Sequence, residues 1–417
     1  MLLATKVMLQ PNNWQTSRLF EYASVARFAY NWALSREMES LSKGQGLISD
    51  GELRKEFTQL KQQSDYSWLY NVSNEVTKQA IKDLVKAFRK YFKKRKEPGY
   101  KPYSKKQIEH AARVGKKLTV YDMKHHPKYK NKRNWDDYKF FDDAEKITIT
   151  VTHVKLTTFA NRGSDRRKLI KGSIRLAEAE RIPTDCKLYN PRVSFDGLHW
   201  WISVSFECPN QPLKLSEEGV GIDLGIKDLA ICSDGNTYKN VNKTRTIKQL
   251  EKRKRRIQRS ISRKYLLNKK GESYSKTCNV KKAEYQLLKV NRRLTNIRAN
   301  YIHQTTSEIV NRKPKFICIE DLNISGMMRN RHLSKSIQDQ CWYEFRRQLT
   351  YKCTRAQIPL VIADRWFPSS KTCICCGNIN KHLKLKDRVY KCQCGSVIDR
   401  DYQASLNLKR YGEQVVG

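Results

Sequence analysis

One short stretch, residues 218–232, constrains the fold of this chain more than any other. From Val220 to Leu224 apolar residues alternate with small or charged ones, which is the two-residue period of a half-buried strand. Gly225 then permits a turn, and residues 229–232 form a second apolar run. The pattern predicts two short strands, with Asp223 near the end of the first and held rigidly by the hydrogen bonds of a sheet.

Two later carboxylates occur in matching settings. The apolar run 316–319 ends in Glu320, and Asp401 lies just before a helical segment that follows Val397. Two strand ends and a helix start could bring these two acids and Asp223 together at one sheet edge. For any one acid alone, a solvated strand edge is the simpler interpretation. Three converging carboxylates, however, repel one another unless a cation lies between them.

Carboxylate oxygens with open coordination positions suit Mg²⁺ or Mn²⁺. A pair of such ions about 3.5–4 Å apart is the usual device for cleaving a phosphodiester bond. The charge balance agrees with a nucleic-acid partner, because 83 Lys and Arg face 41 Asp and Glu and leave a formal charge of +42. Solubility needs far less charge than this, so we expect a polyanionic partner.

The length of 417 residues suggests roughly two to four domains. No apolar stretch approaches the length of a membrane span. The first ten residues are too short for the apolar region and cleavage site of a signal peptide. We therefore expect a cytoplasmic protein, without a membrane partner, in which the 12 cysteines are reduced.

The N-terminal half begins with a predicted strand at residues 2–10, followed by helical patterns at 17–41, 51–61 and 73–92. The third helix carries cations on or near its outer face, among them the candidate phosphate contacts Lys78, Lys82 and Arg89. A solvated face is the alternative. A basic run from Lys93 to Arg133 with interleaved tyrosines follows, and it could bind bases by stacking or serve as a mobile linker.

Residues 146–208 change to alternating β-type patterns. The dipeptide Asp196-Gly197 separates two strand-like runs and predicts a tight hairpin. We expect a small antiparallel β-barrel here. The strand at residues 2–10 is expected to join it, which would make the first helical block an insertion.

In the C-terminal half, residues 248–270 contain eleven Lys or Arg and one acid, Glu251, the composition of a helix that binds a nucleic-acid backbone. Further helices are predicted at 281–310 and 336–356, and a short strand at 359–363. The candidate contacts on the basic helix are Lys252, Arg253, Arg255, Arg256 and Arg259.

Two cysteine pairs near the C-terminus predict a metal site. Cys373 and Cys376 are separated by two residues, Cys392 and Cys394 by one, and each pair is followed by glycine, which permits a turn that aims backbone amides at thiolates. Four thiolates form a closed structural Zn²⁺ site. The spare candidates for ligands are Cys375 and His382.

These segments resemble a known family. Four segments look like the three RuvC motifs and the zinc ribbon of TnpB: residues 221–225, 319–322, 365–373 and 399–407. TnpB proteins are transposon-encoded RNA-guided nucleases related to compact type V CRISPR effectors. The motifs lie between residues 219 and 410, whereas the N-terminal half resembles the family only in layout.

The resemblance implies that Asp223, Glu320 and Asp401 are the catalytic acids and Mg²⁺ ligands, and that the four paired cysteines hold zinc. The chain departs from the family at Gln403, where asparagine is more usual. Asp399 could substitute for Asp401 as a ligand, although the phase of the following helix favours Asp401.

The implied fold is an α/β multidomain protein: an RNase H-like (RuvC) nuclease core with a zinc ribbon, an antiparallel β-barrel (wedge) domain and an inserted α-helical recognition lobe. The expected domains are the first wedge strand (1–12), the helical lobe (13–135), the rest of the wedge (136–212), the nuclease core (213–369), the zinc ribbon (370–396) and the last RuvC motif with the C-terminal helix (397–417).

The implied function is RNA-guided cleavage of double-stranded DNA beside a short target-adjacent motif, using Mg²⁺ or Mn²⁺ and a guide RNA from the transposon end. In this hypothesis helix 73–92 reads the adjacent motif, and the protein acts as a monomer. The alternative is an RNA-guided DNA-binding repressor that does not cleave. A transposase that joins its own element's ends without RNA is a third hypothesis, which a zinc ribbon beside a RuvC-type triad argues against.

Overall fold

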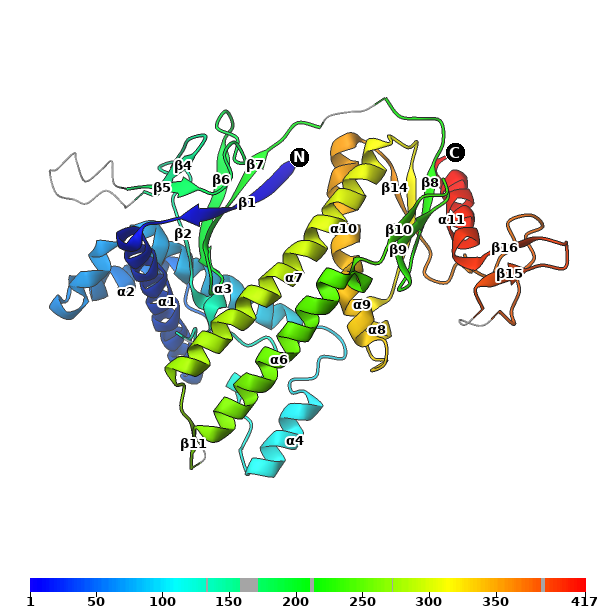
Figure 1. Cartoon of the computed structure of the whole chain (residues 1–417). Coiled ribbons are helices and arrows are strands. Elements are labelled where there is room, and N and C mark those ends of the chain that lie inside the picture. The colour runs from blue at the N-terminus through cyan, green and yellow to red at the C-terminus, as the bar shows by residue number, and fades with distance from the viewer. Residues whose placement is uncertain (133, 158–171, 211–213, 272, 384–386) are drawn as a thin grey trace. The chain divides into compact units, whose positions relative to one another are not determined.

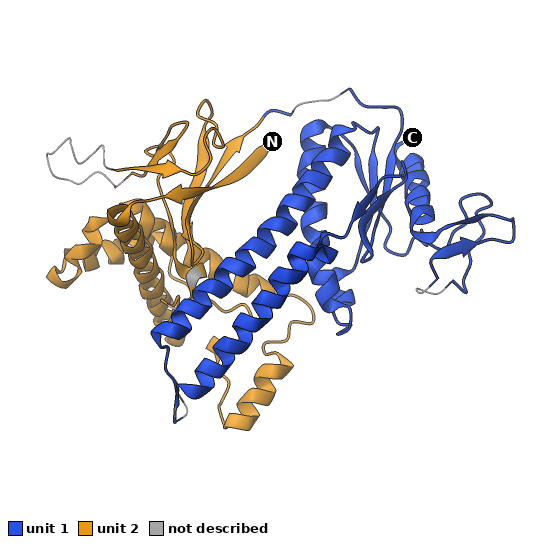
Figure 2. Ribbon diagram, in the orientation of Figure 1, with its two compact units in different colours: residues 1, 209–417 blue, residues 2–208 orange. Residues whose placement is uncertain are grey.

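The computed structural model describes residues 1–132, 134–157, 172–210, 214–271, 273–383 and 387–417. They divide into two compact units, residues 2–208 and residues 209–417 together with Met1 (Figure 2). Each unit has its own sheet and its own hydrophobic core. In the part of the chain described, every helix is too short or too polar to cross a membrane.

An antiparallel sheet forms the centre of the first unit, with the strand order β2-β6-β7-β1-β5-β4-β3 (Figure 1). β1 pairs with β7 from Leu2 opposite Glu207 to Leu9 opposite Trp200, which confirms that the first strand joins this sheet. The strands are β1 (Leu2–Gln10), β2 (Lys139–Phe141), β3 (Thr148–Ile149), β4 (His153–Lys155), β5 (Ser173–Leu176), β6 (Leu188–Phe195) and β7 (Trp200–Glu207).

The predicted hairpin joins β6 to β7. The Asp196 carboxylate accepts hydrogen bonds from the backbone N–H groups of Leu198 and His199, both at 2.9 Å. Gly197 has φ +88°, a conformation that glycine adopts without strain. Closure of the sheet into a barrel stays a prediction, because the pairs found between described residues leave β2 and β3 at the two edges.

Helices of the first unit pack on this sheet around one continuous core. α1 begins at a capping box in which Asn12 and Gln15 each accept a hydrogen bond from the other's backbone N–H. The helices are α1 (Asn13–Ser42), α2 (Asp50–Gln62), α3 (Asn74–Arg95) and α4 (Lys105–Val114), with short 3₁₀ turns η1 (Ser64–Asn71), η2 (Val120–Asp122) and η3 (Trp135–Asp137). The helix α4 lies inside the basic run where a binding segment or linker was expected, and Arg133 of that run lies outside the described residues.

A mixed five-stranded sheet organises the second unit in the order β10-β9-β8-β13-β14. β8, β9 and β10 are antiparallel neighbours, whereas β13 runs parallel to both β8 and β14. The strands are β8 (Val220–Leu224), β9 (Asp228–Cys232), β10 (Thr237–Lys239), β13 (Ile317–Glu320) and β14 (Leu360–Ala363). The two strands predicted within residues 218–232 are therefore confirmed.

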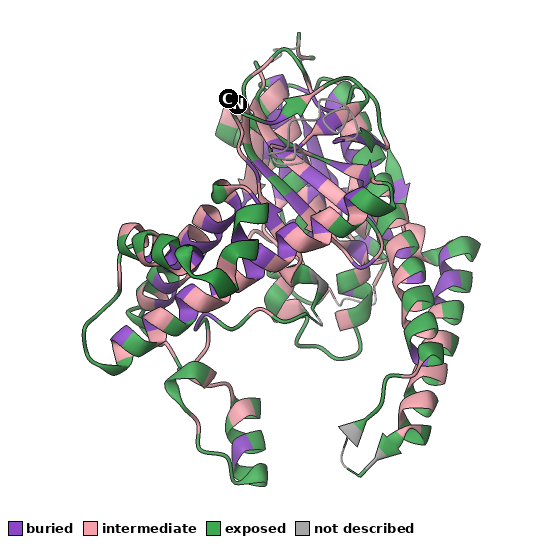
Figure 3. Ribbon diagram, turned by 90° about the vertical axis from the view of Figure 1, so that its left-hand side faces the viewer, coloured by how far each residue is buried: buried purple, intermediate pink, exposed green. Residues whose placement is uncertain are grey.

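Helices cover both faces of the mixed sheet, with α7 and α10 on one side and α11 on the other (Figure 1). α6 and α7 pair side by side as a long hairpin through a small apolar cluster. Figure 3 shows that buried residues gather on the strands and inner helix faces, and that most of this hairpin is exposed. The elements are η4 (Val241–Lys243), α6 (Arg245–Leu267), β11 (Lys269–Lys270), β12 (Ser273–Tyr274), α7 (Cys278–Asn311), α8 (Ile324–Met327), α9 (Ser334–Gln340), α10 (Trp342–Ala356), β15 (Val389–Lys391), β16 (Val397–Asp399) and α11 (Arg400–Val416).

The single helix predicted at 336–356 is wrong. Two helices, α9 and α10, meet at Cys341, which has the left-handed backbone φ +54° and ends the first helix. The break lets Trp342 and Phe345 of α10 enter the core beneath the sheet.

Candidate active site

The carboxyl ends of β8 and β13 place two of the predicted acids next to each other. The parallel register pairs Ile222 with Ile319, so the next residues along the two strands are Asp223 and Glu320. Ile222 and Ile319 belong to the core that β8 and β13 share with α7 and α10. Because strand side chains alternate, both acids lie on the opposite face, the one that α11 covers.

α11 lies very close to β8 because Gly221 has no side chain. A Cβ at this position would lie 2.1 Å from the carbonyl oxygen of Ser405 and 2.3 Å from the backbone nitrogen of Lys409. Gly412 allows a second close approach, since a Cβ there would lie 2.2 Å from the ring of Phe316. These two contacts set α11, whose first turn carries Asp401, against the face that carries the other two acids.

The electrostatics of the three acids link them as one group. Burial raises the pKa of Asp223 well above its ordinary value, and the negative charges of Glu320 and Asp401 raise it further. Burial also raises the pKa of Glu320, although a hydrogen bond from the Ser369 hydroxyl to its Oε1, at 2.7 Å, opposes the shift. Without a cation these carboxyls therefore resist carrying their full charge together.

Asp401 lies between two arginines. The Arg400 guanidinium donates a hydrogen bond to its Oδ1 at 2.8 Å, and the Arg388 guanidinium donates to its Oδ2 at 3.3 Å. Among the described residues, no oxygens of three carboxylates lie within 4.8 Å of one another, as the sulfurs of Cys373, Cys376, Cys392 and Cys394 do. The charges of Glu320 and Asp401 thus act on Asp223, but the three carboxylates are not gathered as tightly as the four thiols, and Asp401 is paired with arginines.

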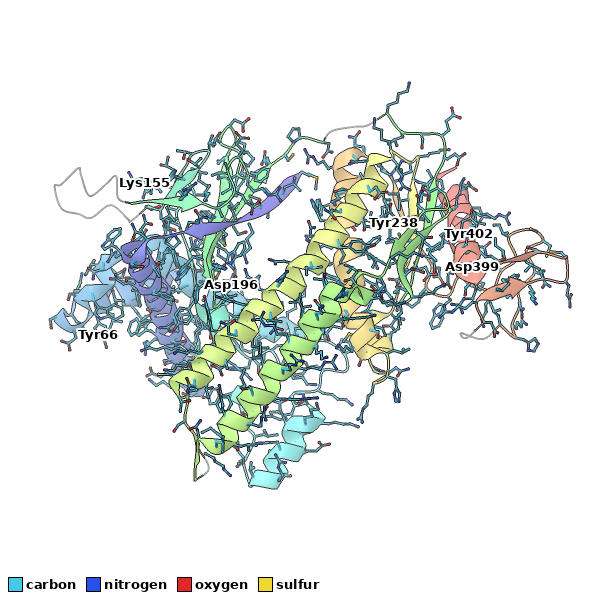
Figure 4. All side chains as sticks on the ribbon, in the orientation of Figure 1. Tyr66, Lys155, Asp196, Tyr238, Asp399 and Tyr402 are labelled. Carbon is cyan, nitrogen blue, oxygen red and sulfur yellow. The ribbon has the colours of Figure 1, made fainter. Side chains whose placement is uncertain are left out.

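Asp399 has a different position. Its Oδ1 accepts hydrogen bonds from the backbone N–H groups of Asp401 and Tyr402, both at 3.0 Å, and caps the N-terminus of α11. Figure 4 labels Asp399 and Tyr402 at this end of the helix. The side chain that was an alternative ligand thus has a structural role in starting the helix.

The segment between β14 and the first cysteine pair is hydrogen-bonded to α11 and to Glu320. Below, the sheet face that carries Asp223 and Glu320, together with Asp401 of α11, is called the acid face. The Asn407 side-chain amide donates to the carbonyl oxygens of Ser369 and Thr372, both at 2.7 Å. Ser369 is buried, and its hydroxyl donates to Glu320. α11 therefore holds the same segment that orients Glu320 and leads into the cysteine cluster.

The four paired cysteines form the tightest candidate metal site. The sulfurs of Cys373, Cys376, Cys392 and Cys394 all lie within 4.8 Å of one another, with Sγ–Sγ distances of 3.7 Å for 373–394 and 3.5 Å for 376–392. Tetrahedral zinc with Zn–S bonds of about 2.3 Å needs sulfurs about 3.8 Å apart. The cluster therefore fits Zn²⁺ with little movement.

The chemistry of this cluster also suits a metal. Although burial opposes the change, hydrogen bonds from the backbone of Cys376 and Cys375 help to lower the pKa of the Cys373 thiol to about 6, which favours the thiolate that binds metal. The thiol of Cys375 lies outside the group, 3.7 Å from the Ser396 hydroxyl. The cluster sits on the small hairpin of β15 and β16, which leads directly into α11.

The predicted nucleic-acid contacts differ in their surroundings. The cations of α6 are exposed along the helix: Lys252, Arg253, Arg255, Arg256 and Arg259. On α3, Arg89 is exposed and Lys82 is partly buried, whereas the Lys78 ammonium lies 2.6 Å from the Glu75 carboxylate. Lys78 is therefore partly neutralised within its own helix, and α6 is the stronger candidate surface.

Several residues that build the site were not predicted from sequence. Contacts between residues separated in the sequence give Gly412, Ser369, Asn407 and Arg388 their roles, whereas Arg400 directly precedes Asp401, the residue that it binds. The only signal for Gly221 was its presence inside a strand pattern, where glycine often marks a close backbone approach.

Three family models match segments of the chain. A model described as "Probable transposase" (OrfB_IS605) matches residues 202–331, and one described as "Cas12f1-like, TNB domain" matches residues 342–408. A third, "Helix-turn-helix domain" of the same OrfB_IS605 type, matches residues 1–46. In the structure this last segment consists of β1 and one continuous helix, α1.

Curated relatives agree with these matches. A protein of Streptomyces pristinaespiralis named "Putative RNA-guided DNA endonuclease" is 29% identical over 98% of this chain and 89% of its own length. InsQ of Escherichia coli (strain K12), with the same description, is 25% identical over 100% of this chain and 93% of its own. The CRISPR-associated endodeoxyribonuclease Cas12f1 of Sulfoacidibacillus thermotolerans is 25% identical over 50% and 49%.

Solved structures similar to this chain include a Cas12f1–sgRNA–target DNA complex, with a TM-score of 0.34, 14% identity and coverage of 98% of this chain and 99% of the other. The mini-RNA-guided endonuclease CRISPR-Cas_phi3 has a TM-score of 0.43, 11% identity and coverage of 98% and 92%. The family models and the curated proteins confirm the resemblance found in the sequence: the chain is similar to OrfB_IS605 proteins, to proteins named putative RNA-guided DNA endonucleases and to Cas12f1.

Proposed function

We propose that this chain is an RNA-guided DNA endonuclease that cleaves double-stranded DNA beside a short target-adjacent motif. The observation that carries the proposal is the acid face. Asp223 and Glu320 lie at the ends of adjacent parallel strands, and the negative charge of Asp401 helps to raise the pKa of Asp223. The names of the curated relatives support the same activity. The mixed sheet, with helices on both faces, is compatible with the RNase H-like (RuvC) core that the sequence resemblance implies.

The donor set on the acid face suits Mg²⁺ or Mn²⁺, which prefer carboxylate oxygens. Bound as a pair, these ions supply a polarised water molecule and stabilise negative charge on the leaving oxygen. Asp223 and Glu320 would hold them, because the two carboxyls follow paired residues of adjacent parallel strands and a cation between them would offset their burial and mutual repulsion. Asp401 would complete the set.

The other residues of the face position these acids. Ser369 donates to one oxygen of Glu320 and so helps to fix its orientation beside Asp223, with which the Glu320 carboxyl also shares a hydrogen bond. Gly221 lets α11 approach β8, which sets the distance of Asp401 from the strand acids. Arg388 and Arg400 would have to share or release Asp401 when a metal ion binds, because both donate to its carboxylate.

The nucleic-acid partners follow from charge and resemblance. A guide RNA from the transposon end would select the target by base pairing, while the protein binds the shape of the RNA–DNA duplex and its phosphates. The exposed cations of α6 supply such phosphate contacts, which weaken steeply as salt increases. The protein is taken to act as a monomer in this proposal.

The test uses the full chain purified with its co-expressed RNA. Sequencing that RNA supplies the guide, and a matched DNA duplex with Mg²⁺ supplies the substrate. Asp223→Ala should abolish cutting and leave DNA binding within about twofold, since the residue acts on the reacting phosphate. Normal cutting by this variant would overturn the assignment of the acid face.

A second function, RNA-guided DNA binding without cleavage, is favoured by one observation. Asp401 is engaged by Arg388 and Arg400, and the three carboxylates form no group as tight as the cysteine cluster in the described part of the chain. If these ion pairs persist in the complete complex, the target would be occupied without strand breaks in Mg²⁺ or Mn²⁺. Footprinting combined with a cleavage assay on the same complex separates the two functions.

A further inference from the structure

Trp366 lies next to the acid face and is exposed for 85% of its surface, more than any other large apolar side chain described in the structure. It follows β14, whose last residue, Ala363, pairs with Glu320. A side chain this exposed buries little apolar surface, so it contributes little to the stability of its own unit. Its exposure beside the candidate active site therefore calls for a ligand with a flat apolar face.

The loop that carries Trp366 is held in place on both sides. The backbone N–H of Trp366 donates to the Asp364 carboxylate at 2.8 Å, and the backbone N–H of Asp364 contacts the Tyr411 hydroxyl at 3.4 Å. The ring of Phe367 packs against the ring of Tyr411 at 4.9 Å between centroids. Tyr411 belongs to α11, the helix that also carries Asp401, so the loop and the acid face share one support.

Cations surround this loop. The carboxylate of Asp321, the residue after Glu320, forms ion pairs with both Arg365 and Arg346, whose side chains are 46% and 43% exposed. Arg346, Arg365 and Lys371 together carry three positive charges against the two carboxylates of Asp321 and Asp364, so the segment around the indole has a net charge of +1. A rigid aromatic ring among cations is the arrangement that binds single-stranded nucleic acid, with the ring stacking on a base and the cations contacting phosphates.

We propose that Trp366 is a stacking platform for an unpaired base of the DNA strand that enters the acid face. The inference rests on the proposed function and deepens it, since it names the single-stranded form of the substrate at the site. Stacking there would hold the strand at a fixed distance from Asp223 and Glu320. Because the loop is already ordered, little conformational freedom is lost when a base binds.

The test first measures binding without guide RNA and without divalent ions, so it does not depend on cleavage. Full-length protein is mixed with a single-stranded oligonucleotide carrying 5-iododeoxyuridine and irradiated with long-wavelength ultraviolet light. Trypsin cuts after Arg365 and Lys371 and releases Trp366 in the peptide of residues 366–371. We expect the cross-link on Trp366, and a cross-link confined to other peptides would overturn the proposal.

Three variants separate stacking from a general loss of charge or folding. Trp366→Ala should weaken binding of the single strand by about 5-fold or more, the range expected for one base stacked on an aromatic ring. Trp366→Tyr should retain most of the affinity, and Trp68→Ala, which removes an indole 39% exposed in the other unit, should retain all of it. Equal losses in all three, or none in Trp366→Ala, would contradict a stacking role.

The complete complex provides the second readout. With guide RNA and Mg²⁺, Trp366→Ala should slow cutting at saturating DNA, whereas Trp366→Tyr should not. A wild-type complex that never cuts counts against the proposed function, while the cross-link still decides the stacking role. If Trp366→Ala instead changes the mass of the protein in solution and leaves the cross-link pattern intact, the indole is a protein-contact residue and the proposal is wrong.

Discussion

Replacing Gly221 by alanine tests whether the close approach of α11 to β8 positions Asp401. The new Cβ would lie 2.1 Å from the Ser405 carbonyl oxygen and 2.3 Å from the Lys409 nitrogen. Both are backbone atoms of α11, so no side-chain rotation can relieve the contact. The helix would have to retreat by about 1 Å, and overpacking of this kind costs about 1–3 kcal/mol of stability.

A shift of this size should affect cleavage more than binding. A misplacement of about 1 Å in a catalytic group can cost about 100-fold in rate. We therefore expect Gly221→Ala to slow single-turnover cutting of matched DNA by roughly 10- to 100-fold, with guide and DNA affinity nearly unchanged. Thermal unfolding measured in parallel shows how much stability is lost.

Two further glycines provide controls. Gly412→Ala introduces a contact of 2.2 Å with the Phe316 ring at the far end of the same helix, so it should lower stability similarly with a smaller loss of rate. Gly51→Ala places its methyl group 3.7 Å from the Ser49 hydroxyl within α2, so it should raise stability slightly, because alanine favours a helix, and leave the cutting rate unchanged. If Gly221→Ala cuts at the wild-type rate, or loses rate only as much as an equally destabilised Gly412→Ala, the positioning argument is wrong.

Three other outcomes are expected. Cys376→Ser should reduce bound zinc, measured by elemental analysis, and lower the melting temperature, because the closed site needs four thiolates. Burial lowers the pKa of Lys352 from 10.5 to about 8, so between these pH values the folded chain binds fewer protons than the unfolded chain. The protein should therefore become more stable as the pH rises from about 8 to 10.5. Lys352→Met should flatten this rise in melting temperature. Asp399→Asn should keep the helix cap and most of the cutting rate, because asparagine also caps helices. Asp401→Asn should greatly reduce the cutting rate. Equal reductions in the two variants would show that Asp399 also binds metal.

Local patterns predicted much of the fold because short-range chemistry decides it. The alternation from Val220 to Leu224 and the Asp196-Gly197 turn each need only neighbouring residues, and both were confirmed. The break at Cys341 was missed because a left-handed cysteine has no sequence signature and the apolar pattern continues across it. α4 was missed because it has only 10 residues inside a basic, proline-punctuated run, and its short apolar face of Ile108, Ala111 and Ala112 is easily overlooked among those charges.

The sequence could indicate which residues form the candidate site, but it could not indicate how their side chains are arranged in space. Sequence motifs left Asp399 and Asp401 as competing ligands, and the hydrogen bonds of α11 separate them. Asp399 uses an oxygen to cap the helix, and the charge that reaches Asp223 comes from Asp401. A capping residue must sit outside the first turn, whereas a residue of that turn can face the sheet. One helix start thus assigns different roles to two identical side chains, and only the packing that Gly221 permits decides how near the second comes to the strand acids.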